Sequence, residues 1–248
     1  MNQPFIIEGF SCPKAGNTPE EYEDAFTYRE IGNGGKYRIS IADGATETSF
    51  SQLWAALLME NYTRNEIPVD QYFKQLESVR RLWSQRISKD PLPWYAAEKA
   101  THGAYAAFLG LEIDASSKKW RAISVGDCCL FHINSPGIEA RLIDLFPMTN
   151  SSQFTFSPNL ICSLSEEQDP AIEIAEGTLR EGDVLFLATD ALSAWFLKRY
   201  EERKPLWNYL AKKLKGEEGF SRLASYAHKN GLHNDDLTLV RIIFSENN

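Results

Sequence analysis

Residues 37–44 read YRISIADG, and this stretch decides the fold class expected for the chain. From Tyr37 to Ile41 apolar and polar side chains alternate, which predicts a β-strand with one face toward a core. The strand runs directly into the turn pair Asp43-Gly44. The stretch therefore predicts one strand of a sheet and a carboxylate at the point where that strand ends.

Further elements are expected on both sides of this strand. Other strands are predicted over residues 5–10, 120–125, 129–133, 140–145, 172–175, 184–188 and 238–244. Helices are predicted over residues 49–62, 69–87, 94–109, 191–199, 206–215 and 219–230. This order lacks the steady strand–helix–strand alternation of a parallel sheet and indicates an α+β fold. We expect a single domain that spans residues 1–248.

Composition narrows the class of protein. Apolar residues make up 43% of the chain and charged residues 24%, as in an ordinary globular protein. The net charge is −8, from 26 basic and 34 acidic residues, which argues against nucleic acid or an anionic membrane as the main partner. An acidic excess does suit a site that gathers carboxylates around cations.

The cysteines and the apolar segments predict the compartment. The four cysteines contain no Cys-x-x-Cys pair, so they indicate neither a zinc site nor a disulfide framework. Reduced, buried thiols are expected instead. The sequence has no secretory signal and no apolar stretch long enough for a membrane helix, so we expect a cytoplasmic protein.

Acidic residues recur where predicted strands begin or end. These positions are Glu23-Asp24, Asp43, Asp127, Asp190 and Asp235-Asp236. Taken one at a time, each is explained equally well as a turn residue, a helix cap or a solvated face. Taken together, they suit hard divalent cations, which prefer oxygen ligands. Two bridged ions can hold a hydroxide and promote in-line displacement at phosphorus.

The order of these motifs resembles the protein phosphatase type 2C family of metal-dependent serine/threonine phosphatases, in a divergent bacterial-type form. The resemblance extends from about Glu8 to Phe244. Its pieces are Glu23-Asp24-Ala25, Ala42-Asp43-Gly44-Ala45-Thr46-Glu47, Val125-Gly126-Asp127, Ala188-Thr189-Asp190-Ala191 and Asn234-Asp235-Asp236-Leu237-Thr238.

The resemblance implies a four-layer αββα sandwich with two central antiparallel sheets. It also implies two Mn²⁺ or Mg²⁺ ions, possibly with a third weak site, and a metal-bridged hydroxide as nucleophile. The metal ligands carried over by motif are Glu23, Asp43, the carbonyl of Gly44, Asp127, Asp190 and Asp235. Asp43 would bridge both ions, Asp24 would orient metal-bound water, and Asp127 would serve the third ion. Residues 146–169 occupy the place of the flap found in bacterial members.

Several positions depart from the family pattern. Thr46-Glu47 stands where the family often has Gly-Gly, and Ala191 replaces a glycine. Ala45 stands where some members have a histidine acid. Pro19 stands where some members have an arginine that grips phosphate, and Lys14 is the nearest upstream cation. These changes leave the expected metal ligands intact.

Three hypotheses about function remain open from the sequence. The first is an active phosphatase that dephosphorylates serine or threonine in a phosphorylated protein substrate during signalling. The second is a catalytically silent sensor or binding module with the same fold, which would be expected to have lost a metal aspartate. None is lost here, so the enzyme is favoured. The third is an unrelated α+β protein with coincidental acidic turns.

Overall fold

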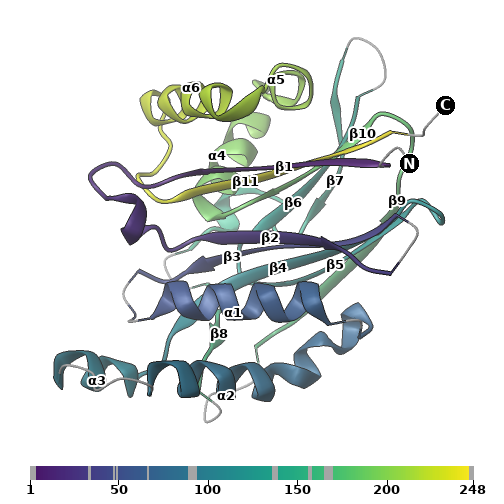
Figure 1. Cartoon of the computed structure of the whole chain (residues 1–248). Helices are drawn as coiled ribbons and strands as arrows, with labels where there is room; N and C mark the ends of the chain where they lie inside the picture. Colours follow the sequence, from purple (N-terminus) through teal and green to yellow (C-terminus); the bar gives the residue numbers. More distant parts are fainter. Residues whose placement is uncertain are drawn as a thin grey trace.

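The protein consists of two β-sheets packed face to face between two layers of helices (Figure 1). This architecture comes from a computed structural model. The structure describes residues 4–32, 35–46, 48, 50–65, 67–88, 94–135, 139–155, 158–164 and 170–245. The expected α+β fold, a four-layer αββα sandwich with two central antiparallel sheets, is confirmed.

All strand pairs in both sheets are antiparallel. The first sheet has the order β1 (Phe5–Cys12), β11 (Leu237–Phe244), β10 (Asp183–Ala188), β6 (Cys129–Asn134) and β7 (Arg141–Phe146). The second sheet has the order β2 (Ala25–Glu30), β3 (Lys36–Gly44), β4 (Tyr105–Asp114), β5 (Lys119–Val125) and β9 (Glu173–Thr178), and β8 (Ile161–Cys162) pairs with β4.

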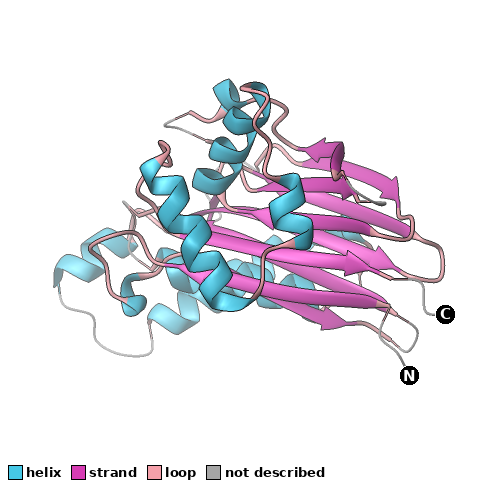
Figure 2. Cartoon of the chain, turned by 90° about the horizontal axis from the view of Figure 1, so that it is seen from above, coloured by secondary structure: helices cyan, strands magenta, loops and turns pink. Residues whose placement is uncertain are grey.

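Helices lie on the outer side of each sheet (Figures 1 and 2). The first sheet is covered by α4 (Asp190–Glu201), α5 (Trp207–Lys212) and α6 (Gly216–Lys229). On the side of the second sheet lie α1 (Ser51–Arg64), α2 (Leu76–Ile87) and α3 (Trp94–Ala100). Short 3-10 helices occur at η1 (Pro19–Glu21), η2 (Val69–Gln75) and η3 (Ser151–Gln153).

Three apolar layers hold these elements together. One layer lies between the sheets and includes Leu109, Leu130 and Leu185. A second lies between the first sheet and α4 to α6, and a third lies between the second sheet and α1 and α2. Every residue of β10 is buried, because this strand has an apolar layer on each face. All four cysteines are free; Cys128, Cys129 and Cys162 are buried, whereas Cys12 is half-buried.

The predicted helix over residues 94–109 is wrong in its second half. The helix α3 ends at Ala100, and residues 105–109 belong to the central strand β4. Small residues such as Ala106 and Ala107 are compatible with a closely packed helix, but here they serve close packing of a strand. A Cβ atom added at Gly110 would lie 2.7 Å from the ring of Tyr62 on α1. The small residues therefore allow α1 to approach the sheet.

Other differences concern boundaries. The predicted helix over residues 69–87 divides into η2 and α2, and the predicted helix over 219–230 begins at Gly216. The predicted flap, residues 146–169, contains η3 and β8. Its residues 156–157 and 165–169 lie outside the described residues, as does position 49 of the first predicted helix. None of the helices in the described ranges has the length and apolarity needed to cross a membrane.

Strand register separates the chain termini from the predicted site. Phe5 pairs with Phe244 at one end of β1 and β11, and Cys12 pairs with Leu237 at the other. The termini lie at the first of these ends (Figure 1). The expected metal-binding carboxylates lie at the second, where β11 begins.

Candidate active site

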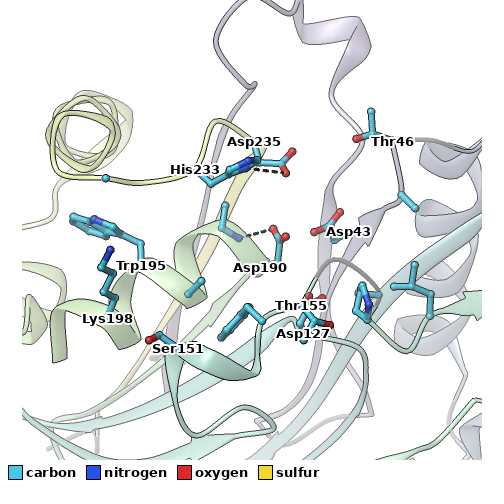
Figure 3. Close-up of a pocket in the computed structure, with 18 of the residues that line it drawn as sticks. Asp43, Thr46, Asp127, Ser151, Thr155, Asp190, Trp195, Lys198, His233 and Asp235 are labelled. Carbon is cyan, nitrogen blue, oxygen red and sulfur yellow. Dashed lines mark hydrogen bonds and ion pairs between the residues drawn. The ribbon is translucent and has the colours of Figure 1, made fainter. Parts of the chain in front are cut away.

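Five predicted aspartates come together at one end of the sandwich (Figure 3 labels four of them). In the first sheet, Asp190 follows the end of β10 and Asp235 precedes the start of β11; these two strands pair there through Ala188 and Leu239. Strand pairing alone therefore places the Asp190 and Asp235 backbones at the same end.

The second sheet contributes in the same way. Asp43 is the penultimate residue of β3, and Asp24 immediately precedes β2, whose first residue pairs with Ala42. Asp127 lies in the turn that carries the chain from β5 in the second sheet to β6 in the first. The site is thus built across the gap between the two sheets.

Burial and mutual repulsion raise the pKa values of these carboxyl groups. Asp24 is 4% exposed and Asp127 is 5% exposed. The pKa of Asp43 is raised well above its usual value, first by burial and then by the charges of Asp24 and Asp190. Burial, followed by the charge of Asp190, likewise raises the pKa of Asp24. Both effects disfavour the ionised carboxylate unless a cation is present.

The pKa values of Asp127 and Asp190 follow the same trend. Burial, followed by the charge of Asp190, raises the pKa of Asp127 to about 7. The pKa of Asp190 is raised by burial and then by Asp235. In the described part of the chain, the ion pairs at this site are weak ones: His233 Nδ1 lies 3.8 Å from Asp235, and Lys14 Nζ lies 4.0 Å from Glu23. The acidic charge is therefore largely uncompensated.

The donor set fits a hard divalent cation in its chemistry. The available ligands are carboxylate and carbonyl oxygens, which Mg²⁺ and Mn²⁺ prefer. Within the described residues, no three His, Cys, Asp or Glu side chains are close enough to enclose an ion.

Gly44 is closely packed at the site. A Cβ atom added there would lie 3.0 Å from the carbonyl oxygen of Glu23 and 3.0 Å from backbone and side-chain atoms of Ser51. The end of β3, the start of α1 and the Glu23 backbone therefore meet with room only for glycine. The hydroxyl of Ser51 also donates a hydrogen bond of 2.8 Å to Glu23 Oε1, which orients that carboxylate.

A groove leads away from the aspartates along α4 (Figure 3). The cavity has a volume of about 1090 Å³. Asp43, Asp127, Asp190 and Asp235 line it at the aspartate cluster, and Ala194, Trp195 and Lys198 of α4 line it further along. The site therefore combines an acidic end with a channel large enough for a peptide segment.

No family model and no curated protein sequence matches the chain. Solved structures do resemble it over nearly its whole length. RsbX in complex with magnesium is 18% identical, with 99% of this chain and 98% of that chain covered and a TM-score of 0.54. A bacterial serine phosphatase is 15% identical, with 98% of each chain covered and a TM-score of 0.63. The S. agalactiae serine/threonine phosphatase is 14% identical, with coverage of 97% and 100% and a TM-score of 0.64.

The chain has the type 2C phosphatase fold. The resemblance expected from the motifs is therefore confirmed at the level of fold. At this low identity the similarity shows the fold alone, and the roles of individual residues follow from the contacts that they make in this chain.

Within this type 2C fold, Asp24 is held by hydroxyl groups that the sequence analysis did not single out. Thr189 Oγ1 and Thr238 Oγ1 each donate a 2.9 Å hydrogen bond to Asp24 Oδ2. The backbone N–H of Thr238 donates to Thr189 Oγ1 at 3.1 Å, and Tyr22 contacts the Thr238 hydroxyl. Both threonines lie inside motifs quoted above, Thr189 directly before Asp190 and Thr238 two residues after Asp236, and these positions are the signal that could have identified them.

Asp236 also has a role that the sequence did not assign. Its carboxylate accepts hydrogen bonds from the backbone N–H groups of Lys14, at 2.8 Å, and Glu23, at 2.7 Å. Asn234 makes two further bonds to the backbone of Ala15. Together these side chains fasten the segment between β1 and β2 to the start of β11. Asp236 therefore positions Glu23, while its neighbour Asp235 lines the groove.

Proposed function

We propose that this protein is a Mn²⁺- or Mg²⁺-dependent phosphatase that hydrolyses phosphoserine or phosphothreonine in protein substrates. One observation carries the proposal: five aspartates from both sheets converge at one end of the groove, buried or half-buried, with raised pKa values on four of them. A folded protein keeps such an unfavourable arrangement where function requires it.

The proposed roles follow the position of each group. Glu23, Asp43, the Gly44 carbonyl, Asp190 and Asp235 would hold two ions, with Asp43 shared between them. When bound, divalent cations activate water at neutral pH and stabilise the charge on a transferring phosphoryl group. Asp43 and Asp24 are the proposed catalytic carboxylates. Because its Oδ2 atom is held by two threonine hydroxyls, Asp24 keeps a fixed orientation from which Oδ1 can accept a proton from water.

Asp127 is proposed to hold a third, more weakly bound ion together with Asp190. The charge of Asp190 is the second cause of the raised Asp127 pKa, after burial, so the two carboxyl groups already interact strongly. Asp127 comes from the short turn between β5 and β6, which joins the two sheets. A cation between Asp127 and Asp190 would relieve their repulsion.

The test is hydrolysis of p-nitrophenyl phosphate and of a phosphoserine peptide after chelation and after metal is restored. Activity should vanish in EDTA and return with Mn²⁺, more strongly than with Mg²⁺. Full activity after exhaustive chelation would rule out metal dependence. A folded, metal-loaded protein with no activity on either substrate would instead favour the silent binding module.

A further inference from the structure

One face of α4 forms a wall of the groove and extends beyond the aspartates. Asp190, Ala194 and Lys198 are four residues apart, which places them on the same side of the helix. All three line the cavity. In Figure 3, Lys198 and Trp195 lie together on α4, away from Asp43 and Asp127. The groove therefore has an acidic end and an end marked by a lysine.

The charges at the lysine end are unequally compensated. Glu201 accepts hydrogen bonds from the backbone N–H of Ser151, at 2.7 Å, and from its hydroxyl, at 2.5 Å. Glu202 pairs with Arg199 at 3.1 Å. No ion pair joins Lys198 to any residue in the described ranges, and its side chain is exposed. The lysine end thus presents one positive charge without a carboxylate partner among the described residues.

Apolar side chains separate this lysine from the aspartates. Ala191 and Ala194 of α4 lie between Asp190 and Lys198 and line the groove, Trp195 lies beside Lys198, and Phe154 and Pro158 line the groove from the segment after η3. Trp195 is 3% exposed, and its indole N–H donates to the carbonyl of Asn230 at 3.0 Å, so the ring is fixed in place. A peptide in the groove would meet a rigid apolar surface before it reached Lys198.

Helix geometry sets the spacing between the two ends. Lys198 follows Asp190 by eight residues, which corresponds to about 12 Å along the helix axis at about 1.5 Å per residue. The lysine side chain leans back toward the helix N-terminus and shortens this distance by several Å. An extended peptide advances about 3.3 Å per residue. The distance therefore spans about two to four residues of substrate and is too long for a single phosphate group.

We propose that this groove binds the segment of a phosphoprotein next to the phosphorylated residue, and that Lys198 selects an acidic side chain two to four residues away from it. This inference rests on the proposed function and specifies the substrate class for the same site. The occupant follows from charge complementarity: Lys198 lacks a carboxylate partner in the described part of the chain, Glu202 is paired with Arg199, and the carboxylate of Glu201 is directed toward Ser151.

The experiment is a scan of phosphoserine peptides that carry a single Glu at each position from four before to four after the phosphoserine, in a neutral background. One or two positions should raise kcat/KM by about two- to fivefold over the all-neutral peptide, the range of an exposed ion pair. Lys198→Ala should remove this preference, and Lys198→Glu should transfer it to peptides with Lys at the same position. Lys213→Ala, which removes an exposed lysine that does not line the groove, should keep the preference.

The anisotropy of labelled peptides in EDTA provides a second readout that does not need turnover. The acidic peptide should bind more tightly than the neutral one by a similar factor, and Lys198→Ala should abolish the difference. Equal kcat/KM and equal binding across the scan would overturn the inference, even if p-nitrophenyl phosphate is hydrolysed. A Lys198→Ala defect equally large on p-nitrophenyl phosphate would also overturn it, because Lys198 would then contact the reacting phosphate. Failure of the wild type to hydrolyse p-nitrophenyl phosphate with Mn²⁺ would instead count against the proposed function.

Discussion

Two buried arginines in this protein have counter-charges beside them, whereas a group of buried aspartates has none among the described residues. Arg38 on β3 is 2% exposed and bonds Glu112 Oε2 through Nε at 3.0 Å and Nη2 at 2.8 Å. It also donates to the carbonyl groups of Tyr62, Asn65 and Ile67, at and beyond the C-terminus of α1. The positive charge therefore has both a counter-charge and acceptors for its N–H groups.

Arg241 repeats this arrangement in the other sheet. It lies on β11, is 5% exposed, and bonds Glu8 Oε2 at 2.9 and 2.5 Å. It donates to the carbonyl groups of Leu210 and Leu214, at 3.0 and 2.8 Å, at the end of α5. Each sheet is thus tied to a helix on its outer face by one fully partnered arginine.

The aspartates at the end of the sandwich lack such partners. Asp43 is surrounded by other carboxyl groups, whose charges raise its pKa. Arg38, by contrast, is bonded to the opposite charge of Glu112. A partnered buried charge is explained by structure alone, whereas a group of like charges is costly to the metal-free fold. The absence of a counter-charge, more than burial itself, therefore distinguishes the charges proposed to be functional from the structural ones.

The largest expected effect comes from Asp43→Asn. This change removes the charge proposed to be shared by both ions, so kcat should fall by about a thousandfold or more, the scale of losing a key catalytic interaction. The metal-free variant should be at least as stable as the wild type, because one repelling charge is gone. Turnover assays test the expected loss of kcat, and thermal melting in EDTA tests the expected stability of the metal-free variant. Near-normal turnover would show that Asp43 is only a turn residue.

Arg38→Met should chiefly lower the stability of the fold, whereas Asp43→Asn should chiefly lower turnover. Without Arg38, the carbonyl groups of Tyr62, Asn65 and Ile67 lose their donor, which costs about 1–3 kcal/mol for each buried group left without a partner. Glu112 keeps Lys36, at 2.8 Å, as its remaining cation. Urea unfolding measures this loss. The double variant Arg38→Met with Glu112→Gln should regain part of it, because the carboxylate that had lost one of its two cations is gone. A single variant as stable as the wild type would contradict the view that structural charges here depend on their partners.

The smallest of these effects is a pH dependence of the metal-free protein. Burial and the charge of Asp190 raise the pKa of Asp127 in the folded state to about 7, from an ordinary value of about 3.9, so folding favours its protonated form. The folded state then binds more protons than the unfolded state, and stability should fall as pH rises from about 4 to 7, by roughly 1–3 kcal/mol. Melting of the EDTA-treated protein between pH 5 and 8 measures this slope.

Asp127→Asn provides the matched control for this slope. It removes the titrating carboxyl group while keeping a side chain of similar size, so the fall in stability between pH 5 and 8 should become shallower. Addition of Mn²⁺ should stabilise the wild type more at pH 8 than at pH 5, because ionised carboxylates bind the cation better. A wild type whose stability rises with pH would contradict the uncompensated-charge interpretation.

Much of the fold was predictable from local sequence patterns. Alternation over residues 37–41 and the apolar run before Asp190 identify strands, because side chains in a sheet repeat every two residues or are buried on both faces. Carboxylates directly after such runs must lie at strand ends. The order of the motifs also linked Asp43, Asp190 and Asp235, and in the structure the charge of Asp235 is among the causes that raise the pKa values of Asp43 and Asp190.

Other features depend on contacts between distant parts of the chain, which no local pattern encodes. Small residues near position 107 suit a packed helix and a central strand equally well, and the approach of α1 to Gly110 decides between them. Asp235 and Asp236 are neighbours of identical chemistry, yet the backbone N–H groups of Lys14 and Glu23 make Asp236 a positioning residue. The sequence by itself determined most of the strands, although not β2, β4 or β8, and the acidic positions beside them. Only the tertiary structure decided which of those acids face one another and that Lys198 shares a groove with them, because both depend on long-range packing.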